Sequence, residues 1–272
     1  MHDAPSIDGN TKIMGLIGSP VTQVKTPQAI NPIFAEAGAN ILCVPIHVDD
    51  LETAMAGFRA MHNLIGFGVT LPHKQQIASL CDSLDPAAEQ VEAVNVVRRE
   101  RDGSFRGYQF DGRGFVGGSM AQGHDPKGRS VLVIGAGGAS AAIVTALIMA
   151  GASEVGISNR TTSRAEALAQ QVRARIGGNV HACDPMPKPG QMIVNATSLG
   201  MDEADALPLD PALLDESMLV AEVIAKPAIT ALLEQARQRG ATIHGGQHMI
   251  EGQVPMIAAH FLALYGPDQI KA

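Results

Sequence analysis

The fold of this chain is decided by the stretch Ser130–Ser140, which reads SVLVIGAGGAS. Its first half is an apolar strand candidate, its second half is a turn of small residues, and the helical pattern of Ala141–Ala150 follows directly. Another strand candidate, Glu154–Ser158, completes a βαβ unit. Such a glycine turn lets a backbone approach a pyrophosphate, while the N–H groups of the helix point at its negative charge. The context predicts a dinucleotide-binding unit, against the alternative of a tight structural turn.

Short apolar runs alternate with helical patterns on both sides of this unit. The strand candidates upstream are Ile13–Ile17, Ile41–Ile46 and Gly66–Thr70, followed by Val94–Arg98 and Ser104–Tyr108 on either side of a hairpin signal at Asp102-Gly103. The helix candidates are Pro27–Ala37, Leu51–Met61, Lys74–Ser79 and, near the end of the chain, Met249–Leu264. This βαβα rhythm predicts an α/β protein with largely parallel sheets, in which two halves meet after Asp111.

Composition and charge argue against several classes of protein. The 272 residues include 20 basic and 27 acidic side chains, and the net charge of −7 argues against a broad nucleic-acid-binding face. No apolar run approaches the ~18 residues of a membrane span. The first residues show neither a basic leader nor an apolar segment, so no secretory signal is expected. The cysteines Cys43, Cys81 and Cys183 lack metal-ligand spacing and fit a reducing cytoplasm.

The residues after Glu154–Ser158 indicate which nicotinamide cofactor this unit prefers. A carboxylate at that place hydrogen-bonds the ribose 2′-hydroxyl of NAD and repels a 2′-phosphate. This chain instead has Asn159-Arg160-Thr161-Thr162-Ser163-Arg164, which offers guanidinium groups and hydroxyls to a phosphate. The sequence therefore favours NADP, with NAD as the alternative because an arginine also stacks on adenine.

Polar side chains of the N-terminal half lie at the ends of predicted strands, where open α/β sheets bind ligands. Thr70 and Lys74 are separated by a proline turn, Asn95 follows Ala93-Val94, and Asp111 lies in a glycine-flanked turn. A lysine and an aspartate that meet at a substrate hydroxyl form a proton-transfer pair. Taken singly, Lys74 is an exposed charge and Asp111 is a turn residue or helix cap. Their joint pattern points to acid–base chemistry.

A series of short motifs runs in order through the whole chain: Gly18-Ser19-Pro20, Thr26-Pro27, Asn31, Val69-Thr70-x-Pro72-x-Lys74, Ala93-Val94-Asn95, Asp111, Gly135–Ala139, Asn159-Arg160-Thr161, Asn195-Ala196-Thr197-Ser198-x-Gly200-Met201 and Gln253. This series resembles the shikimate dehydrogenase family. The resemblance implies hydride transfer between a ring alcohol and a nicotinamide. It also implies a substrate-binding catalytic domain of residues 1–111 plus 245–272, and a doubly wound Rossmann domain for NADP over residues 112–244.

The resemblance assigns roles to individual residues. Lys74 and Asp111 would be the acid–base pair, and the substrate site would include Val24, Thr26, Thr70, Asn95 and Gln253. The residues expected at the cofactor are Gly135, Ala136, Gly137, Gly138, Ala139, Asn159, Arg160, Thr161, Arg164, Asn195, Ala196, Thr197, Ser198, Met201, Val223 and Gly246. No metal site is expected, because the stretch from His244 to His248 lacks the spacing of a metal motif.

Departures from the family pattern fall on the pocket side of the expected site. The family's first substrate motif reads roughly His-Ser-x-Ser-Pro, whereas this chain has Gln23-Val24-Lys25-Thr26-Pro27, and Ile224 stands where the family has a tyrosine. The two serines hold the substrate carboxylate, so Val24 removes one hydroxyl and Thr26 keeps the other. A lost hydrogen bond to a charged group costs about 1.5–3 kcal/mol. We therefore expect the alcohol chemistry to be retained and the preference for shikimate to be weakened.

The resemblance implies a cytoplasmic oxidoreductase of aromatic amino acid biosynthesis, in the chorismate pathway, acting on shikimate, quinate or a related cyclic polyol. The expected partners are NADP and this small substrate, without nucleic acid or membrane, in a monomer or homodimer. One alternative is an NAD-dependent quinate- or aminoshikimate-type dehydrogenase. Another is a non-catalytic cofactor-binding sensor, which would have no need of a lysine–aspartate pair.

Overall fold

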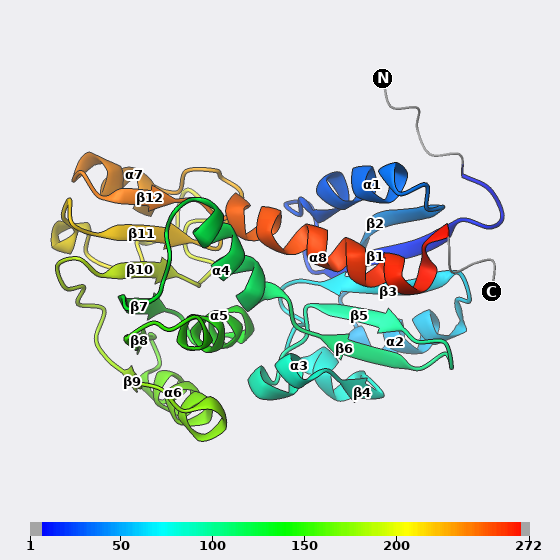
Figure 1. Ribbon diagram of the computed structural model, residues 1–272, viewed down its shortest axis with the longest axis horizontal. Helices are drawn as coiled ribbons and strands as arrows, with labels where there is room; N and C mark the ends of the chain where they lie inside the picture. Colours follow the sequence, from blue (N-terminus) through cyan, green and yellow to red (C-terminus); the bar gives the residue numbers. More distant parts are fainter. Residues whose placement is uncertain (1–6, 268–272) are drawn as a thin grey trace. The chain divides into compact units, whose positions relative to one another are not determined.

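The computed structural model describes residues 7–267, which form two compact units (Figure 1). The first unit comprises the chain up to Phe110 together with the chain from Val254, and the second comprises Asp111–Gln253. Each unit contains a six-stranded sheet of its own, and helices alternate with the strands. The α/β class with largely parallel sheets, predicted from the alternation of apolar runs and helical patterns, is confirmed.

The sheet of the first unit is built around β1 (Lys12–Gly18), whose last five residues are buried. The strands lie in the order β2-β1-β3-β5-β6-β4. Their bounds are β2 (Ile41–His47), β3 (Leu64–Val69), β4 (Ser83–Leu84), β5 (Val96–Arg99) and β6 (Phe105–Tyr108). β1 is parallel to β2 and β3, whereas β5 is antiparallel to β3 and β6. The ends of β1, β3 and β6 and the start of β5 therefore lie at one edge of the sheet.

The helices of the first unit are α1 (Thr26–Glu36), α2 (Leu51–Ala60), the 3-10 helix η1 (Gln76–Leu80), α3 (Pro86–Val91) and the later turns of α8 (Gln247–Tyr265). The helix predicted over Lys74–Ser79 is a turn through Gln75 followed by η1. The carbonyl of Lys74 accepts a hydrogen bond from the backbone N–H of Val94 at 2.8 Å. Because that carbonyl is engaged with the start of another strand, a regular helix does not begin at Lys74.

The second unit is a doubly wound sheet in which every strand pairing is parallel and the order is β12-β11-β10-β7-β8-β9. The strands are β7 (Ser130–Ile134), β8 (Glu154–Ser158), β9 (Val180–Ala182), β10 (Met192–Asn195), β11 (Leu219–Glu222) and β12 (Thr242–His244). The helices are α4 (Asp111–Ala121), α5 (Gly138–Met149), α6 (Thr162–Ile176), η2 (Pro211–Leu213) and α7 (Ala231–Gln238). The strand order reverses between β7 and β10, and sheets of this kind bind ligands outside the carboxyl ends of the strands at that point.

Glycines bring α4 against the first turns of α8 within the second unit. A Cβ added to Gly118 would lie 2.1 Å from the carbonyl oxygen of His248, and one added to Gly114 would lie 2.5 Å from the Cβ of Gln253. The two helices therefore pack backbone to backbone. This contact lies within the second unit, which extends through Gln253, and the chain from Val254 belongs to the first unit.

Substitution of Gly118 by alanine is expected to destabilise the protein by roughly 1–3 kcal/mol, because the new methyl group would meet a backbone carbonyl that has no room to move. Gly117→Ala is the matched control, since an added Cβ there meets nothing within 4 Å. That control is expected to be neutral or to stabilise the exposed helix position by up to about 1 kcal/mol. Urea unfolding measures both effects, and equal midpoints for the two variants would contradict the packing argument.

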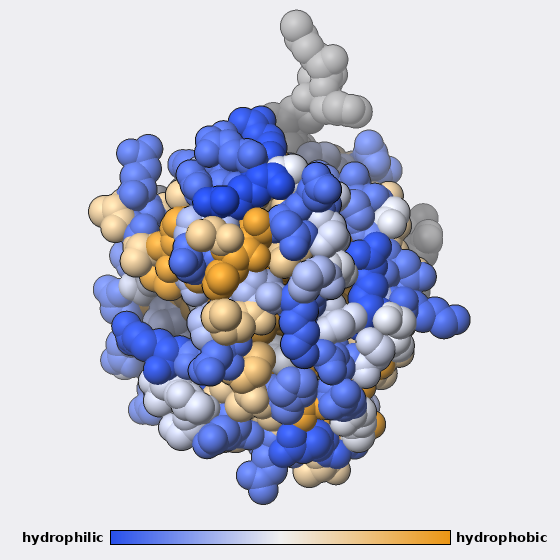
Figure 2. Space-filling model, turned by 90° about the vertical axis from the view of Figure 1, so that its left-hand side faces the viewer, coloured by the Kyte–Doolittle hydropathy of each residue, from blue (hydrophilic) through white to orange (hydrophobic). Residues whose placement is uncertain are grey.

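One face of the second unit is mainly polar. Figure 2 shows hydrophilic residues over most of this face and a small area where hydrophobic residues gather. Isolated apolar side chains and small apolar areas are normal on protein surfaces. Within residues 7–267, no helix combines the length and the apolar character needed to cross a membrane.

Candidate functional site

The carboxyl edge of the first sheet brings Thr70, Lys74 and Asn95 together. Thr70 follows β3 directly, and Asn95 precedes β5. The carbonyl of Asn95 accepts a hydrogen bond from the backbone N–H of Val69 at 2.7 Å, and the carbonyl of Lys74 accepts one from the N–H of Val94 at 2.8 Å. These backbone bonds join the loop that carries Thr70 and Lys74 to the residues that enter β5.

Two buried amides lie at the same edge. Asn95 is 6% exposed, and its Oδ1 accepts a hydrogen bond from the backbone N–H of Phe110 at 2.8 Å. Gln109 is 4% exposed, and its Nε2 donates to the carbonyl of Ala93 at 3.1 Å. Together they fix the segment that follows β6 against the start of β5. Sequence reasoning did not include Gln109 among the site residues, although an amide next to Asp111 at a strand end is a usable signal.

The loop between β1 and α1 carries the departures from the family motif. Val24 is half-buried, Lys25 is exposed, and Thr26 is the half-buried first residue of α1. The backbone N–H of Val24 donates to the carbonyl of Val21 at 3.3 Å, which closes a turn at the end of β1. An apolar side chain therefore occupies the position where the family pattern has a hydroxyl.

A polar cluster of Ser19, His47 and Asp49 lies where β1 and β2 end. The hydroxyl of Ser19 donates to Oδ1 of Asp49 at 2.7 Å and lies 3.0 Å from Nε2 of His47. The Ser19 hydroxyl, and next His47, lower the pKa of Asp49. The same imidazole nitrogen lies 3.3 Å from Asp49, so the serine and the carboxylate do not contact opposite nitrogens of the ring. This arrangement is not the relay of a serine hydrolase.

Asp111 and Gln253 lie on the two packed helices of the second unit. Asp111 is the first residue of α4 and is 2% exposed. Gln253 of α8 packs on Gly114, one helical turn further along α4. The second unit thus places these two expected substrate-site residues on neighbouring turns. Lys74 belongs to the first unit, and its pairing with Asp111 stays a prediction.

The glycine turn at the end of β7 fits a dinucleotide phosphate. Gly135 has a φ of +115°, and a Cβ there would lie 2.9 Å from Oγ of Ser140 and 3.1 Å from the carbonyl oxygen of Ala196. Ala136 and Gly137 follow, and α5 begins with Gly138 and Ala139 without a side-chain cap. The N–H groups of its first turn have no partner within the helix, which suits them to bind an anion.

Two arginines lie near the start of α6, directly after β8. Arg160 and Arg164 are exposed, and Thr161 is the N-cap of the helix. Nδ2 of Asn159 donates to the carbonyl of Thr161 at 2.9 Å, which shapes the turn between strand and helix. The positive charge of the arginines suits a phosphate group. The backbone N–H groups at the helix N-terminus also point toward a bound anion.

The turn after β10 is held by Asn195. This residue is fully buried, and its Oδ1 accepts from the N–H and the hydroxyl of Thr197 at 3.1 and 2.6 Å. Its Nδ2 donates to the carbonyl of Leu199 at 2.9 Å. Ala196 is half-buried, whereas Ser198 and Met201 are exposed. Asn195 therefore fixes the shape of the turn, and Ser198 and Met201 lie exposed at the carboxyl edge of the sheet.

Glu222, the last residue of β11, is a buried carboxylate that sequence reasoning missed. It is fully buried and lies 3.1 and 3.0 Å, through its two oxygens, from Nδ2 of Asn195. Burial raises the pKa of Glu222 to about 7, against hydrogen bonds from Asn195, Thr230 and the backbone of Ile224. The available signal was a lone acid at the end of an apolar strand, next to the strand that ends in Asn195.

Val223 and Gly246 meet at the ends of β11 and β12. A Cβ on Gly246 would lie 2.4 Å from the carbonyl oxygen of Ile224 and 2.5 Å from the carbonyl carbon of Val223, so the two backbones are in contact. Ile224 is 5% exposed and fills the place that the family gives to a tyrosine. These two expected cofactor residues therefore lie together at the carboxyl edge of the second sheet.

Three imidazoles gather near the junction of β12, α4 and α8. The ring of His244 lies 5.5 Å from that of His124 and 4.7 Å from that of His248. Burial lowers the pKa of His244 to about 4. Within residues 7–267, no group of three or more histidine, cysteine, aspartate or glutamate side chains is placed to hold a metal ion.

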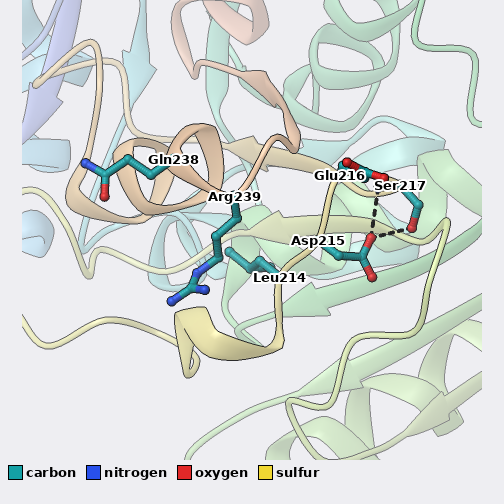
Figure 3. Close-up of a pocket in the computed structure, with 6 residues that line it drawn as sticks. All are labelled: Leu214, Asp215, Glu216, Ser217, Gln238 and Arg239. Atoms are coloured by element: carbon teal, nitrogen blue, oxygen red, sulfur yellow. Dashed lines mark hydrogen bonds between the residues drawn. The ribbon is translucent and has the colours of Figure 1, made fainter.

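A shallow pocket of about 700 Å³ lies at the other edge of the second sheet. Its lining comes from the residues before β11 and from the end of α7: Leu214, Asp215, Glu216, Ser217, Gln238 and Arg239. Figure 3 shows Asp215 hydrogen-bonded to Ser217 and turned away from Arg239. Because these residues precede the strands β11 and β12, the pocket is not part of the carboxyl edge, where the expected cofactor residues lie.

Known proteins resemble this chain along most of its length. The shikimate dehydrogenase substrate binding domain matches residues 16–97, and the shikimate/quinate 5-dehydrogenase family matches residues 119–188. The shikimate dehydrogenase (NADP(+)) of Rubrobacter xylanophilus is 42% identical over 257 residues, which cover 90% of this chain and 89% of that protein. The chain belongs to the shikimate dehydrogenase family. The resemblance drawn from the order of its motifs is confirmed.

Solved structures share the fold of this chain. A crystal structure of shikimate dehydrogenase in complex with NADP+ has a TM-score of 0.86 and 28% identity, and the match covers 98% of this chain and 96% of that one. The ligand-free 5-ketofructose reductase of Gluconobacter sp. strain CHM43 has a TM-score of 0.78 and 28% identity, covering 94% and 92%. The protein is thus an NAD(P)-dependent oxidoreductase of this family.

Proposed function

We propose that this protein transfers a hydride between NADP and a ring hydroxyl or ketone of shikimate, quinate or a related cyclic polyol. The observation that carries the proposal is the carboxyl edge of the first sheet, where backbone hydrogen bonds gather Thr70, Lys74 and Asn95. This edge lies in the unit whose sequence matches the substrate-binding domain of the family. Initial rates of NADP reduction with shikimate and with quinate test the proposal, and no turnover of any cyclic polyol would contradict it.

The proton transfer is assigned to the chain's own residues. When bound, the nicotinamide accepts a hydride from the alcohol carbon or returns it to the ketone carbon. During oxidation, the neutral amine of Lys74 would take the hydroxyl proton, and during reduction its ammonium would return that proton to the ketone oxygen. Asp111 would orient the amine, while Thr70, Asn95 and Gln253 would hold the substrate hydroxyls.

The start of α6 supports NADP as the cofactor. We expect Arg160→Ala to raise the KM for NADP on the order of tenfold, because the substitution removes a guanidinium that would donate two hydrogen bonds to the 2′-phosphate. The KM for NAD, which lacks this phosphate, is expected to change little. Arg175→Ala, at the other exposed end of the same helix, is the control. Equal losses with both cofactors would show that Arg160 does not read the phosphate.

A second substrate class, a neutral ketose or polyol, is favoured by the β1–α1 loop. Val24 places an apolar side chain where the family pattern has a carboxylate-binding serine. The 5-ketofructose reductase that shares this fold is named for a substrate that is a keto sugar. Parallel kcat/KM measurements with shikimate and with neutral cyclic or open-chain ketoses would rank the two classes.

Two alternative functions predict a different behaviour toward the cofactor. An NAD-dependent quinate- or aminoshikimate-type dehydrogenase would show the opposite cofactor preference, and a non-catalytic sensor would bind NADPH without turnover.

We place the protein in the cytoplasm, as a monomer or homodimer in aromatic amino acid biosynthesis. The free thiols of Cys43, Cys81 and Cys183 suit a reducing compartment. Size-exclusion chromatography with light scattering decides the oligomeric state.

A further inference from the structure

Glu222 is a buried carboxylate of the second unit that has no part in the proposed hydride and proton transfer. It ends β11, the neighbour of β10 in the sheet, and so lies beside Asn195 and one strand further from β7. Glu222 is fully buried, so its own side chain is not exposed at the edge at which a cofactor would bind. Any effect it has on the cofactor must act through the residues it holds.

The carboxylate of Glu222 accepts hydrogen bonds from three neighbours. Nδ2 of Asn195 donates at 3.1 and 3.0 Å, and the hydroxyl of Thr230 donates at 2.8 Å. The backbone of Ile224 supplies a further hydrogen bond. All of these neighbours are donors toward Glu222, and a carboxylate accepts them without needing to donate. These donors therefore favour the ionised form, whereas burial opposes the charge and raises the pKa.

The bond to Asn195 leads to the glycine turn. With Nδ2 held by Glu222 and Leu199, Oδ1 of Asn195 faces the N–H and hydroxyl of Thr197. That turn lies against Gly135, since a Cβ there would be 3.1 Å from the carbonyl oxygen of Ala196 and 3.1 Å from Cγ2 of Thr197. The orientation of one amide thus sets how the turn after β10 meets the turn after β7.

The other bond leads to α7. The hydroxyl of Thr230 donates to Glu222 and accepts from the backbone N–H of Leu233, which makes Thr230 the N-cap of α7. A Cβ on Gly200 would lie 3.3 Å from Cβ of Thr230, so the end of the Asn195 turn rests on the same threonine. Glu222 therefore supports both ends of the segment from Asn195 to Gly200.

No charged side chain is among the causes that set the pKa of Glu222, which is raised by burial and lowered by hydrogen bonds. The charged residues on the elements packed against it are exposed or half-buried: Asp202, Glu203, Asp205, Lys226, Glu234, Arg237 and Arg239. His244 of the neighbouring strand β12 is buried, and burial lowers its pKa to about 4. Asp205 accepts hydrogen bonds from the backbone N–H groups of Gly200 and Asp202 at 2.9 and 3.1 Å, and these hydrogen bonds lower its pKa. Of the groups around this segment, Glu222 is thus the carboxylate poised to change charge near neutral pH.

We propose that ionised Glu222 is a positioning residue for the nicotinamide side of the cofactor site, acting through Asn195 and Thr230 on the turn that borders Gly135. The inference rests on the proposed function, because it takes the carboxyl ends of β7 and β10 as the cofactor site. Protonation removes an acceptor from the network, so the amide of Asn195 is free to turn and the segment from Asn195 to Gly200 relaxes. Cofactor affinity follows the charge of Glu222.

Fluorescence titration with NADPH between about pH 5.5 and about pH 8.5 tests this coupling. Glu222→Gln keeps the length of the side chain and holds it uncharged at every pH. The ratio of its Kd to that of the wild type is expected to be close to one at the acid end and to rise to about tenfold at the alkaline end. Taking the ratio removes the titration of the NADPH phosphate, which is common to both proteins. A ratio that does not change with pH would overturn the inference.

The matched control is Glu154→Gln, at the opposite end of the same sheet, where the carboxylate accepts a hydrogen bond from Ser130 at 2.8 Å. Its Kd ratio is expected to stay near one throughout. Melting curves separate positioning from misfolding: burial raises the pKa of Glu222 from 4.5 to about 7, so its stabilising contribution is present below the lower value and lost as the pH rises through the upper one. The glutamine variant avoids that loss and is expected to melt no lower than the wild type at the alkaline end. Failure of the wild type to bind NADPH at any pH would overturn the proposed function itself, and this inference with it.

Discussion

Replacing Lys74 with alanine is expected to lower kcat by roughly 10³-fold while leaving the Kd for NADPH nearly unchanged. The amine is the group assigned to move the substrate proton, and the expected cofactor residues lie in the other unit. Stopped-flow or steady-state rates with the best substrate, together with fluorescence titration of NADPH, measure the two quantities on the same preparation. A general loss of structure would lower kcat and raise the Kd for NADPH.

Lys74→Arg distinguishes proton transfer from charge. Its guanidinium keeps the positive charge, but it does not give up a proton under these conditions. We therefore expect it to be nearly as inactive as the alanine variant. Lys127→Ala, in an exposed loop of the second unit, serves as the control and is expected to keep full activity. More than a tenth of wild-type kcat in the alanine variant would remove Lys74 from its assigned role.

Restoring a hydroxyl at position 24 is expected to restore affinity for shikimate. Val24→Ser adds back one hydrogen bond to the substrate carboxylate, and hydrogen bonds to charged groups correspond to roughly 10- to 150-fold in affinity. The KM for shikimate should fall by a factor in this range, whereas the KM for a neutral polyol should stay the same or rise. Steady-state kinetics with both substrates measure the change in preference.

The matched control makes the same chemical change in the same loop. Val21→Ser also replaces a half-buried valine by serine, three residues earlier. It is expected to give no gain with shikimate, because the hydroxyl expected from the family pattern is at position 24. If the two variants gain equally, or if the wild type already turns over shikimate as fast as any neutral polyol, the divergence of the carboxylate site is refuted.

The strands and the glycine turn could be predicted because their causes are local in the sequence. A run such as Ser130–Ile134 is apolar because both faces of a parallel strand are covered, and Gly135 follows because its φ of +115° excludes most side chains. These features need no knowledge of the rest of the chain. The family resemblance then followed from the order of such local motifs.

Features that depend on distant residues escaped the same reasoning. The helix predicted over Lys74–Ser79 was wrong at its start because the Lys74 carbonyl bonds to Val94, which enters a different strand. The burial of Glu222 depends on Asn195, 27 positions earlier, and Thr230, 8 positions later. Neither sequence periodicity nor propensity reports that three polar side chains will converge under one loop.

The helix α8 is shared between the two units, and this sharing affects the order in which the units are completed during synthesis. Its later turns complete the first unit: Phe261 is fully buried and lies within reach of Gly66 of β3, and the hydroxyl of Tyr265 donates to the carbonyl of Arg99 at 2.6 Å. During synthesis, the last residue of the second unit, Gln253, is added before the segment from Val254 that covers the first unit. The half of the protein whose synthesis starts first is therefore the half whose last segment is synthesised last.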